Sequence, residues 1–303
     1  MAVVVFGLLK NKMKIAYIIL AFKNPEQVFR MILRLQARDS DFYLHIDQNS
    51  KFEGFEKIPD DINRGNLYFS EKRFNSNWSG FGCVEALLFN MKNILDSNKN
   101  YDFIITLTGQ DYPIKPASFI NNFLTEHKEN IFMHNFKLPN PTWKDGGIKR
   151  VTSYHFNIFK NRVVIKILHR IMIWLIPALP KKDMGVQYDL YGGEAHFIFP
   201  FEIVKYILDF IDHNPRFLSF FKHTYMPDEV IFQTLIMNST FKNKVINNSL
   251  KYIDWTRPKA GLPAILRKED FKNLEKSEGL FARKFDTYID ESILDLIDKK
   301  LIP

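Results

Sequence analysis

The sequence predicts an α/β fold with a mostly parallel central sheet flanked by helices. Short apolar runs, typical of buried strands, alternate with longer amphipathic segments, beginning with the run at 14–21 and the helical pattern at 25–37. Such alternation favours strand–helix–strand units, in which the strands run parallel. The chain has 303 residues, of which 46% are hydrophobic and 15% aromatic, enough for a sizeable core.

Each element of the first half has a local reason in the sequence. The run at 14–21 ends before Asn24, and Pro25 suits the first turn of a helix, where its missing N–H costs nothing. In 82–96, apolar residues recur at helical spacing. The expected strands are 14–21, 42–46, 67–69, 102–107 and 131–134, and the expected helices are 25–37, 82–96 and 116–127.

The second half continues the same alternation after residue 195. Pro227 followed by Asp228 and Glu229 is typical of a helix start, because carboxylates interact favourably with the positive end of the helix dipole. We therefore expect a strand at 195–200 and helices at 201–212, 227–236 and 290–299.

We expect residues 13–303 to form a single domain, since no repeat or low-complexity linker divides them. Met13 opens a cleaner strand-like segment, so residues 1–12 are interpreted as an extension from an upstream start. They lack the charged start and cleavage site of a signal peptide, and no apolar run reaches membrane-spanning length. The single cysteine, Cys83, excludes an intramolecular disulfide and fits a cytoplasmic location.

The net charge of +8 is concentrated in residues 149–182, an insertion with eight basic and no acidic residues, so the rest of the chain sums to zero. A local basic segment argues against a nucleic-acid partner. Within it, 156–176 mixes basic residues with Trp174 and other apolar side chains, which predicts peripheral contact with an anionic membrane. The alternative is a helix packed on the core with a solvated basic face.

Two polar turns follow predicted strands, one at Asp47 and one at 108–113, which contains Asp111. In open parallel sheets, ligands bind beyond the carboxyl ends of the strands. The sequence therefore places both turns at a binding site, although Gly, Asp and Pro are also ordinary turn formers.

Two further motifs carry groups with suitable chemistry. Asp228 and Glu229 can supply a general base, or can serve only the helix dipole. Arg283 and Lys284 lie between aromatic residues and can bind phosphate, or can form a solvated basic pair. No paired-histidine or thiolate zinc motif, phosphate-binding loop, dinucleotide fingerprint or nucleophile elbow is present.

Taken in order, these motifs make the chain resemble the core-2/I-branching β-1,6-N-acetylglucosaminyltransferase family, which includes the peptide O-xylosyltransferases. The matching segments are 16–21, 45–50, 78–88, 108–114, 227–229, 252–255 and 280–286. The resemblance implies a GT-A-type, Rossmann-like glycosyltransferase fold. It also implies inverting, metal-independent transfer of a sugar, GlcNAc first among them, from a UDP-sugar to a saccharide acceptor, with no cofactor.

The resemblance also implies roles for individual residues. Glu229 maps onto the base, and Arg283 and Lys284 map onto the groups that bind the donor diphosphate. Fixed cations can neutralise the UDP leaving group as a metal would. The nucleoside and donor sugar are assigned to Asp47, Asp111, Trp78, Ser79 and Gly80. Further candidates are Asp228, Glu194, Trp255, Arg257 and Lys259.

One segment departs from the family pattern on the acceptor side. At 191–196, where relatives carry a Trp, this chain has Ala195, with Glu194 before it. The sequence predicts a saccharide or lipid-linked glycan acceptor, surface-glycan synthesis, and a cytoplasmic enzyme peripheral on the inner face of the membrane. The alternatives are a xylosyl or other UDP-sugar transferase, and a noncatalytic module that binds saccharides or membrane surfaces.

Overall fold

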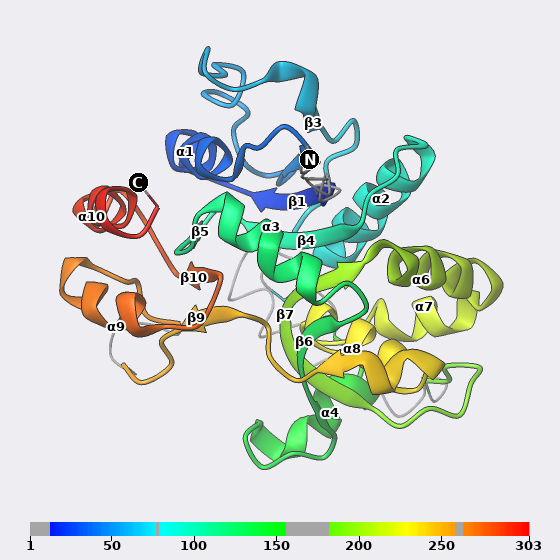
Figure 1. Ribbon diagram of the computed structural model, residues 1–303. Helices are drawn as coiled ribbons and strands as arrows, with labels where there is room; N and C mark the ends of the chain where they lie inside the picture. Colours follow the sequence, from blue (N-terminus) through cyan, green and yellow to red (C-terminus); the bar gives the residue numbers. More distant parts are fainter. Residues whose placement is uncertain (1–12, 77–78, 156–181, 258–262, 303) are drawn as a thin grey trace, which may run out of the picture.

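The computed structural model describes residues 13–76, 79–155, 182–257 and 263–302. Its centre is a seven-stranded sheet in the order β3-β2-β1-β4-β7-β6-β8 (Figure 1). The strands are β1 Ile15–Ala21, β2 Ser40–Ile46, β3 Leu67–Phe69, β4 Phe103–Thr108, β6 Ile131–Lys137, β7 Tyr191–Pro200 and β8 Val245–Ile246. Neighbours are parallel except where β7 pairs with β4 and β6, which confirms the predicted mostly parallel α/β sheet.

Helices cover both faces of this sheet. Alternate residues of β1 belong to different cores, with Ile15, Tyr17 and Ile19 on one face and Ala16 and Ile18 on the other. The first face packs against α1 Pro25–Leu35, α3 Ala117–Glu126 and α10 Ser292–Lys300. The second packs against α2 Gly82–Asp96, α6 Phe201–His213, α7 Pro215–Phe221 and α8 Ile231–Met237. Strands buried on both faces explain the continuous apolar runs in the sequence.

A second, three-stranded sheet was not predicted. It consists of β5 Asp111–Pro113, β10 Phe281–Arg283 and β9 Lys251–Ile253, with β10 in the middle. Asp111 therefore lies in a strand and not in the turn expected from the sequence. β10 runs antiparallel to β5 and parallel to β9, and its register sets Arg283 opposite both Asp111 and Ile253.

The helix expected at 227–236 is also wrong at its start. Pro227–Glu229 forms a 3-10 turn, and α8 begins only at Ile231. Val230 (φ −134°) breaks the helix between them, and Met226 before the turn has φ 51°. Glu229 thus lies on a separate turn beside β7, rather than in the first turn of α8.

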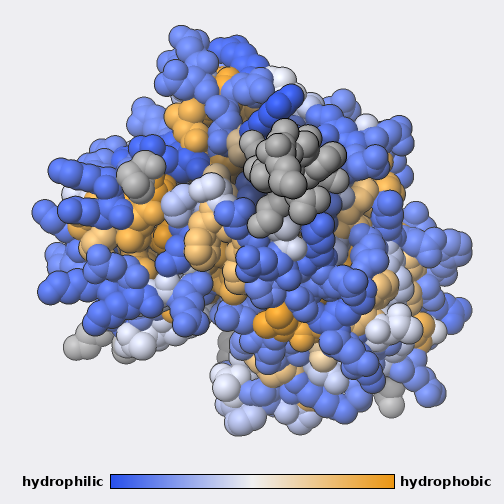
Figure 2. Space-filling model, viewed as in Figure 1, coloured by the Kyte–Doolittle hydropathy of each residue, from blue (hydrophilic) through white to orange (hydrophobic). Residues whose placement is uncertain are grey.

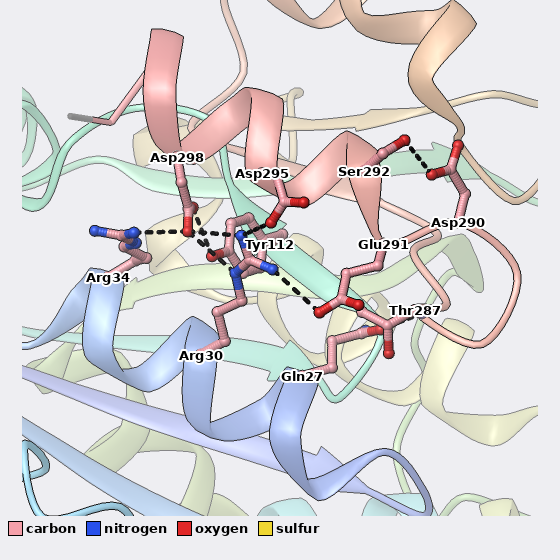
Figure 3. Close-up of polar contacts among 10 residues, drawn as sticks. All are labelled: Gln27, Arg30, Arg34, Tyr112, Thr287, Asp290, Glu291, Ser292, Asp295 and Asp298. Carbon is pink, nitrogen blue, oxygen red and sulfur yellow. Dashed lines mark hydrogen bonds and ion pairs between the residues drawn. The ribbon is translucent and has the colours of Figure 1, made fainter.

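Buried ion pairs tie the C-terminal helix α10 to the first helix and to β5 (Figure 3). Asp298 accepts hydrogen bonds from Arg30, Arg34 and the Tyr112 hydroxyl, at 3.1, 2.7 and 2.7 Å. Asp295, more exposed, lies 2.6 Å from Arg30. Since Tyr112 belongs to β5, this network anchors the small sheet against α1 and α10.

The outer surface is mostly hydrophilic on the face drawn in Figure 2, with hydrophobic side chains in separate patches. No helix among the described residues is long and apolar enough to cross a membrane. The extension at 1–12 and the amphipathic segment at 156–176 lie outside the described residues, as does Trp174. The remaining helices are the short α4 Ile148–Thr152 and α9 Phe271–Lys276.

Candidate active site

Glu229 is held by an arginine from another part of the chain. Nη1 of Arg150, in α4, donates to Oε2 of Glu229 at 2.6 Å. Each side chain is about one-fifth exposed. Burial raises the pKa of Glu229, and Arg150 acts in the opposite direction by charge and by hydrogen bond. A partly buried carboxylate with a raised pKa suits a general base that works near neutral pH.

Asp228 lies beside Glu229 in the same turn. Burial and the neighbouring charge of Glu229 raise the pKa of Asp228 to about 7, against opposing effects of Arg150 and Arg283. Arg283 and Glu194 also act electrostatically on Glu229. The structure thus brings together Glu229, Asp228, Glu194 and Arg283, which sequence analysis selected separately.

The small sheet buries a charged cluster around Asp111. Lys251 Nζ lies 2.8 Å from Oδ2 of Asp111, and the same oxygen accepts from the Thr108 backbone N–H at 2.6 Å. Arg283 Nε lies 3.6 Å from Oδ1. The Lys251 side chain is only 2% exposed, so its charge is compensated almost entirely by Asp111.

His196, from β7, closes this cluster on the side of the large sheet. The Arg283 guanidinium donates to Nε2 of His196. Burial, together with the charges of Lys251 and Arg283, lowers the pKa of His196 well below its usual range. A neutral His196 can accept from Arg283 and leaves the arginine with its full charge.

Lys284 belongs to a second group of charges, at the carboxyl end of β1. Lys23 pairs with Asp286, which also accepts from the Asn24 amide at 2.9 Å. Burial and the charges of Arg283 and Lys23 lower the pKa of Lys284. Cations forced this close together favour an anionic ligand, because it relieves their repulsion.

Two glutamines, Gln27 and Gln110, form hydrogen bonds with the segment that carries Lys284. Gln27 of α1 donates to the Gly109 carbonyl at 2.7 Å and accepts from the Thr287 N–H at 2.9 Å. The Gln110 carbonyl accepts from the Phe285 N–H at 2.9 Å. Gln27 is buried, and these contacts fix the chain directly after Lys284, at Phe285 and Thr287.

Asp47 and Ser79, predicted to bind the nucleoside and donor sugar, form hydrogen bonds with the protein backbone. Asp47 follows β2, and its carboxylate accepts from the backbone N–H groups of Asn49 and Ser76 at 2.7 and 2.5 Å. The Ser79 carbonyl accepts from the Met226 N–H at 3.2 Å, so the segment with Gly80 lies against the turn that carries Glu229. Trp78 lies outside the described residues.

Two other candidates follow β9 in the chain. Arg257 lies between Asp254 and Asp270, at 2.7 and 3.0 Å, so two carboxylates already compensate its charge. Trp255 is half exposed. Lys259 falls outside the described residues.

Several contributing residues were not identified from the sequence. Arg150 was assigned to the basic membrane-contact segment, but its side chain lies against Glu229. Lys182, from the same segment, donates to the Val151 carbonyl at 2.6 Å. Lys251 directly precedes the recognised segment 252–255, and His196 ends the segment 191–196, so both were within reach of sequence analysis.

The arrangement combines a partly buried carboxylate of raised pKa with several cations. Within residues 13–76, 79–155, 182–257 and 263–302, no group of three or more His, Cys, Asp or Glu side chains could hold a metal ion. Chemically, the arrangement suits proton removal beside an anionic leaving group.

Comparison with known proteins gives one family for most of the chain. A family model described as Core-2/I-Branching enzyme matches residues 15–275. Xylosyltransferase oxt of Drosophila melanogaster is 25% identical over 94% of this chain and 33% of its own length. Xylosyltransferase 2 of Rattus norvegicus is 24% identical, with coverages of 94% and 33%. The chain thus spans about a third of the length of these relatives.

Solved structures give weaker similarity. Mouse xyloside xylosyltransferase 1 in its apo form is 9% identical with a TM-score of 0.38, covering 88% of this chain and 97% of the mouse chain. The mannosyltransferase Ktr4p from S. cerevisiae is also 9% identical, with a TM-score of 0.39 and coverages of 77% and 68%. These scores are too low to support conclusions about this chain.

Proposed function

Because the chain belongs to the Core-2/I-branching enzyme family, we propose that it is an inverting glycosyltransferase. It transfers a sugar from a UDP-sugar to a saccharide acceptor. The observation that carries this proposal is that Glu229 and Arg283, from distant parts of the chain, both lie against β7: the turn with Glu229 packs beside this strand, and Arg283 donates to His196 within it. One group suits proton removal and the other suits a diphosphate.

In this mechanism Glu229 removes the proton from the acceptor hydroxyl as that oxygen attacks the anomeric carbon. The bond between the sugar and the UDP oxygen breaks on the opposite side, so one displacement inverts the configuration. A UDP-α-sugar then gives a β-linkage. Glu229 ends the step protonated, for which its raised pKa is suited.

The leaving diphosphate gains negative charge as that bond breaks. Arg283 and Lys284 supply positive charge that is already fixed in position, so little reorganisation is needed during the reaction. Metal independence follows as part of the proposal, since these cations provide the charge that a divalent ion would bring.

The donor sugar has two candidates. The sequence resemblance put GlcNAc first, whereas the named relatives are xylosyltransferases, which favours xylose. Incubation with UDP-xylose and UDP-GlcNAc in a metal-chelating buffer, followed by measurement of released UDP, tests both. We expect slow hydrolysis of one donor without acceptor. A noncatalytic saccharide-binding module would release UDP from neither.

We also propose that the acceptor is attached to a lipid. A lipid-linked glycan in surface polysaccharide synthesis would bring the protein to the inner face of the membrane, and the basic composition of 149–182 supports such contact. Co-sedimentation with anionic vesicles at low salt is the expected result. Absence of binding there would remove the membrane part and leave the transferase part standing.

A further inference from the structure

We propose that Arg150 is a positioning residue, which fixes the Glu229 carboxylate through Oε2 and leaves Oε1 for the acceptor hydroxyl. This inference rests on the proposed function, because it has meaning only if Glu229 is the base. It also gives α4 a role in the reaction that the sequence did not indicate.

The contact with Glu229 uses one end of a side chain that is held on several sides. The Arg150 guanidinium carbon lies 3.7 Å from the centre of the Trp143 ring and 5.5 Å from that of Tyr225. The Arg150 carbonyl accepts from the Tyr225 N–H at 3.0 Å. A guanidinium stacked in this way has little freedom left, so the hydrogen bond to Glu229 has a fixed direction.

Trp143 is itself set in place by two glycines. A Cβ on Gly147, which has φ 80°, would lie 2.6 Å from Cε3 of Trp143. A Cβ on Gly192, in β7, would lie 2.5 Å from Cη2 of the same ring. The indole therefore fits only because both positions lack a side chain, and it also packs edge-on to Phe136 at 4.9 Å. The platform under Arg150 is thus specified by residues of three separate segments.

Arg150 is also the strongest of the neighbours that favour the charged form of Glu229. Burial and the charge of Glu194 raise the pKa of Glu229. Arg150 lowers this pKa by its charge and by its hydrogen bond, and Arg283 lowers it by a smaller amount. Asp228, next in the chain, has its own pKa raised by burial and by Glu229. Among the described residues, none donates a hydrogen bond to Oε1 of Glu229.

The test is the pH dependence of kcat/KM for sugar transfer by Arg150→Gln. Loss of the cation leaves burial and Glu194 to act on the carboxylate, so the pKa of Glu229 rises. The acidic limb of the pH profile should move to higher pH by about 1 to 3 units, the usual effect of a close opposite charge on a pKa. The rate of the variant should approach that of the wild type at high pH, which a merely structural defect would not allow.

Matched variants separate the possible causes. Arg150→Lys keeps the charge but loses the planar fork, so its limb should shift upward by less. Arg216→Gln removes an exposed arginine whose nearest carboxylate is 3.9 Å away, and its profile should match the wild type. Thermal unfolding of each variant monitors the fold, and Arg150→Lys remains informative if Arg150→Gln does not fold.

The outcomes are distinguishable. If Arg150→Gln folds and the acidic limb of its pH profile does not move, the positioning role is wrong, even if the rate falls equally at every pH. If only Arg150→Lys folds, the same outcome in that variant is decisive. No turnover by the wild type, or full activity of Glu229→Gln, contradicts the proposed function instead. An upward shift with recovery at high pH supports both.

Discussion

At the scale of single residues, the site depends on carboxylates whose charge is opposed by burial and supported by arginines. Glu229 and Asp228 are adjacent in one turn, and each is partly buried. Burial is the first cause of the raised pKa in both. Arg150 and Arg283 approach from other elements and limit that rise. Because Glu229 also accepts a hydrogen bond from Arg150, the two neighbouring carboxylates can hold different protonation states at the same pH.

Glu229→Gln is the most direct test of the base. The amide keeps the size of the side chain but cannot take a proton, so kcat should fall by roughly 10²–10⁴-fold. The affinity for UDP, measured by calorimetry, should remain close to that of the wild type. Glu202→Gln, an exposed glutamate that pairs with Lys244, is the matched control and should leave both quantities unchanged. Residual full activity would remove Glu229 as the base.

Asp228 makes the stability of the protein depend on pH. Its pKa in the folded state is about 7, above the ordinary value of 3.8, so the folded state binds more protons between these values. The Asp228 contribution to the free energy of unfolding should therefore fall as pH rises from 4 to 7, by up to about 1.4 kcal/mol per pH unit. Asp228→Asn should flatten this dependence in urea titrations. Asp60→Asn, at an exposed position, should not.

At the scale of elements, the small sheet carries the cluster around Asp111, and β7 of the large sheet contributes His196 to it. β10 sets Arg283 opposite Asp111 of β5, and Lys251 of β9 reaches the same carboxylate. Most strands of the large sheet were predicted, because long apolar runs mark strands buried on both faces, and the short strand Leu67–Phe69 was predicted as well. The three strands of the small sheet were missed, because each is too short to show a period and pairs with segments far away in the sequence.

Lys251→Met should show how much the small sheet depends on this buried pair. The change leaves Asp111 without its closest cation, and breaking one side of a buried ion pair costs about 3–5 kcal/mol. The free energy of unfolding from urea titrations should fall accordingly. Lys272→Met, on the exposed side of α9, should change it by less than about 0.5 kcal/mol. Equal stability of the two variants would contradict a structural role for the pair.

Lys284→Ala tests the cationic segment after β10. One charge-assisted hydrogen bond contributes about 1.5–3 kcal/mol, so the Kd for UDP should rise by about tenfold or more. The fold should remain intact, because Lys284 forms no ion pair within the described part of the chain, and Gln27 and Gln110 hold its segment through the backbone. Lys299→Ala, at an exposed position of α10, is the control. An unchanged UDP affinity would count against the diphosphate assignment.

At the scale of the whole molecule, the last helix is joined to the first. Figure 3 shows Asp298 of α10 facing Arg30, Arg34 and Tyr112. The helix expected at 290–299 corresponds to α10, but its partnership with α1 was not predicted, since nothing in a local pattern indicates which distant helix an acidic residue will face. The site residues stay predictions, chosen from short and recognisable motifs, whereas Arg150 and Lys251 have ordinary surroundings in the sequence.

Asp298→Ala should measure how much the contacts between α10, α1 and β5 contribute to stability. Arg30, Arg34 and the Tyr112 hydroxyl would all lose a partner, so the free energy of unfolding should fall by about 3–5 kcal/mol. Asp295→Ala removes a carboxylate from the same helix that is 66% exposed, and should cost at most about 1 kcal/mol. Thermal unfolding compares them directly. Similar costs would show that the network contributes nothing beyond surface charge.

The position of β10 in the middle of the small sheet also sets an order of assembly during synthesis. All strands of the large sheet have been synthesised once Ile246 is added, whereas β5 and β9 cannot be joined until Phe281–Arg283 follows. A nascent or truncated chain ending before Phe281 can therefore form most of the fold and still lack the cations proposed to hold a donor. The ability to bind UDP is expected to arise only in the final stage of translation.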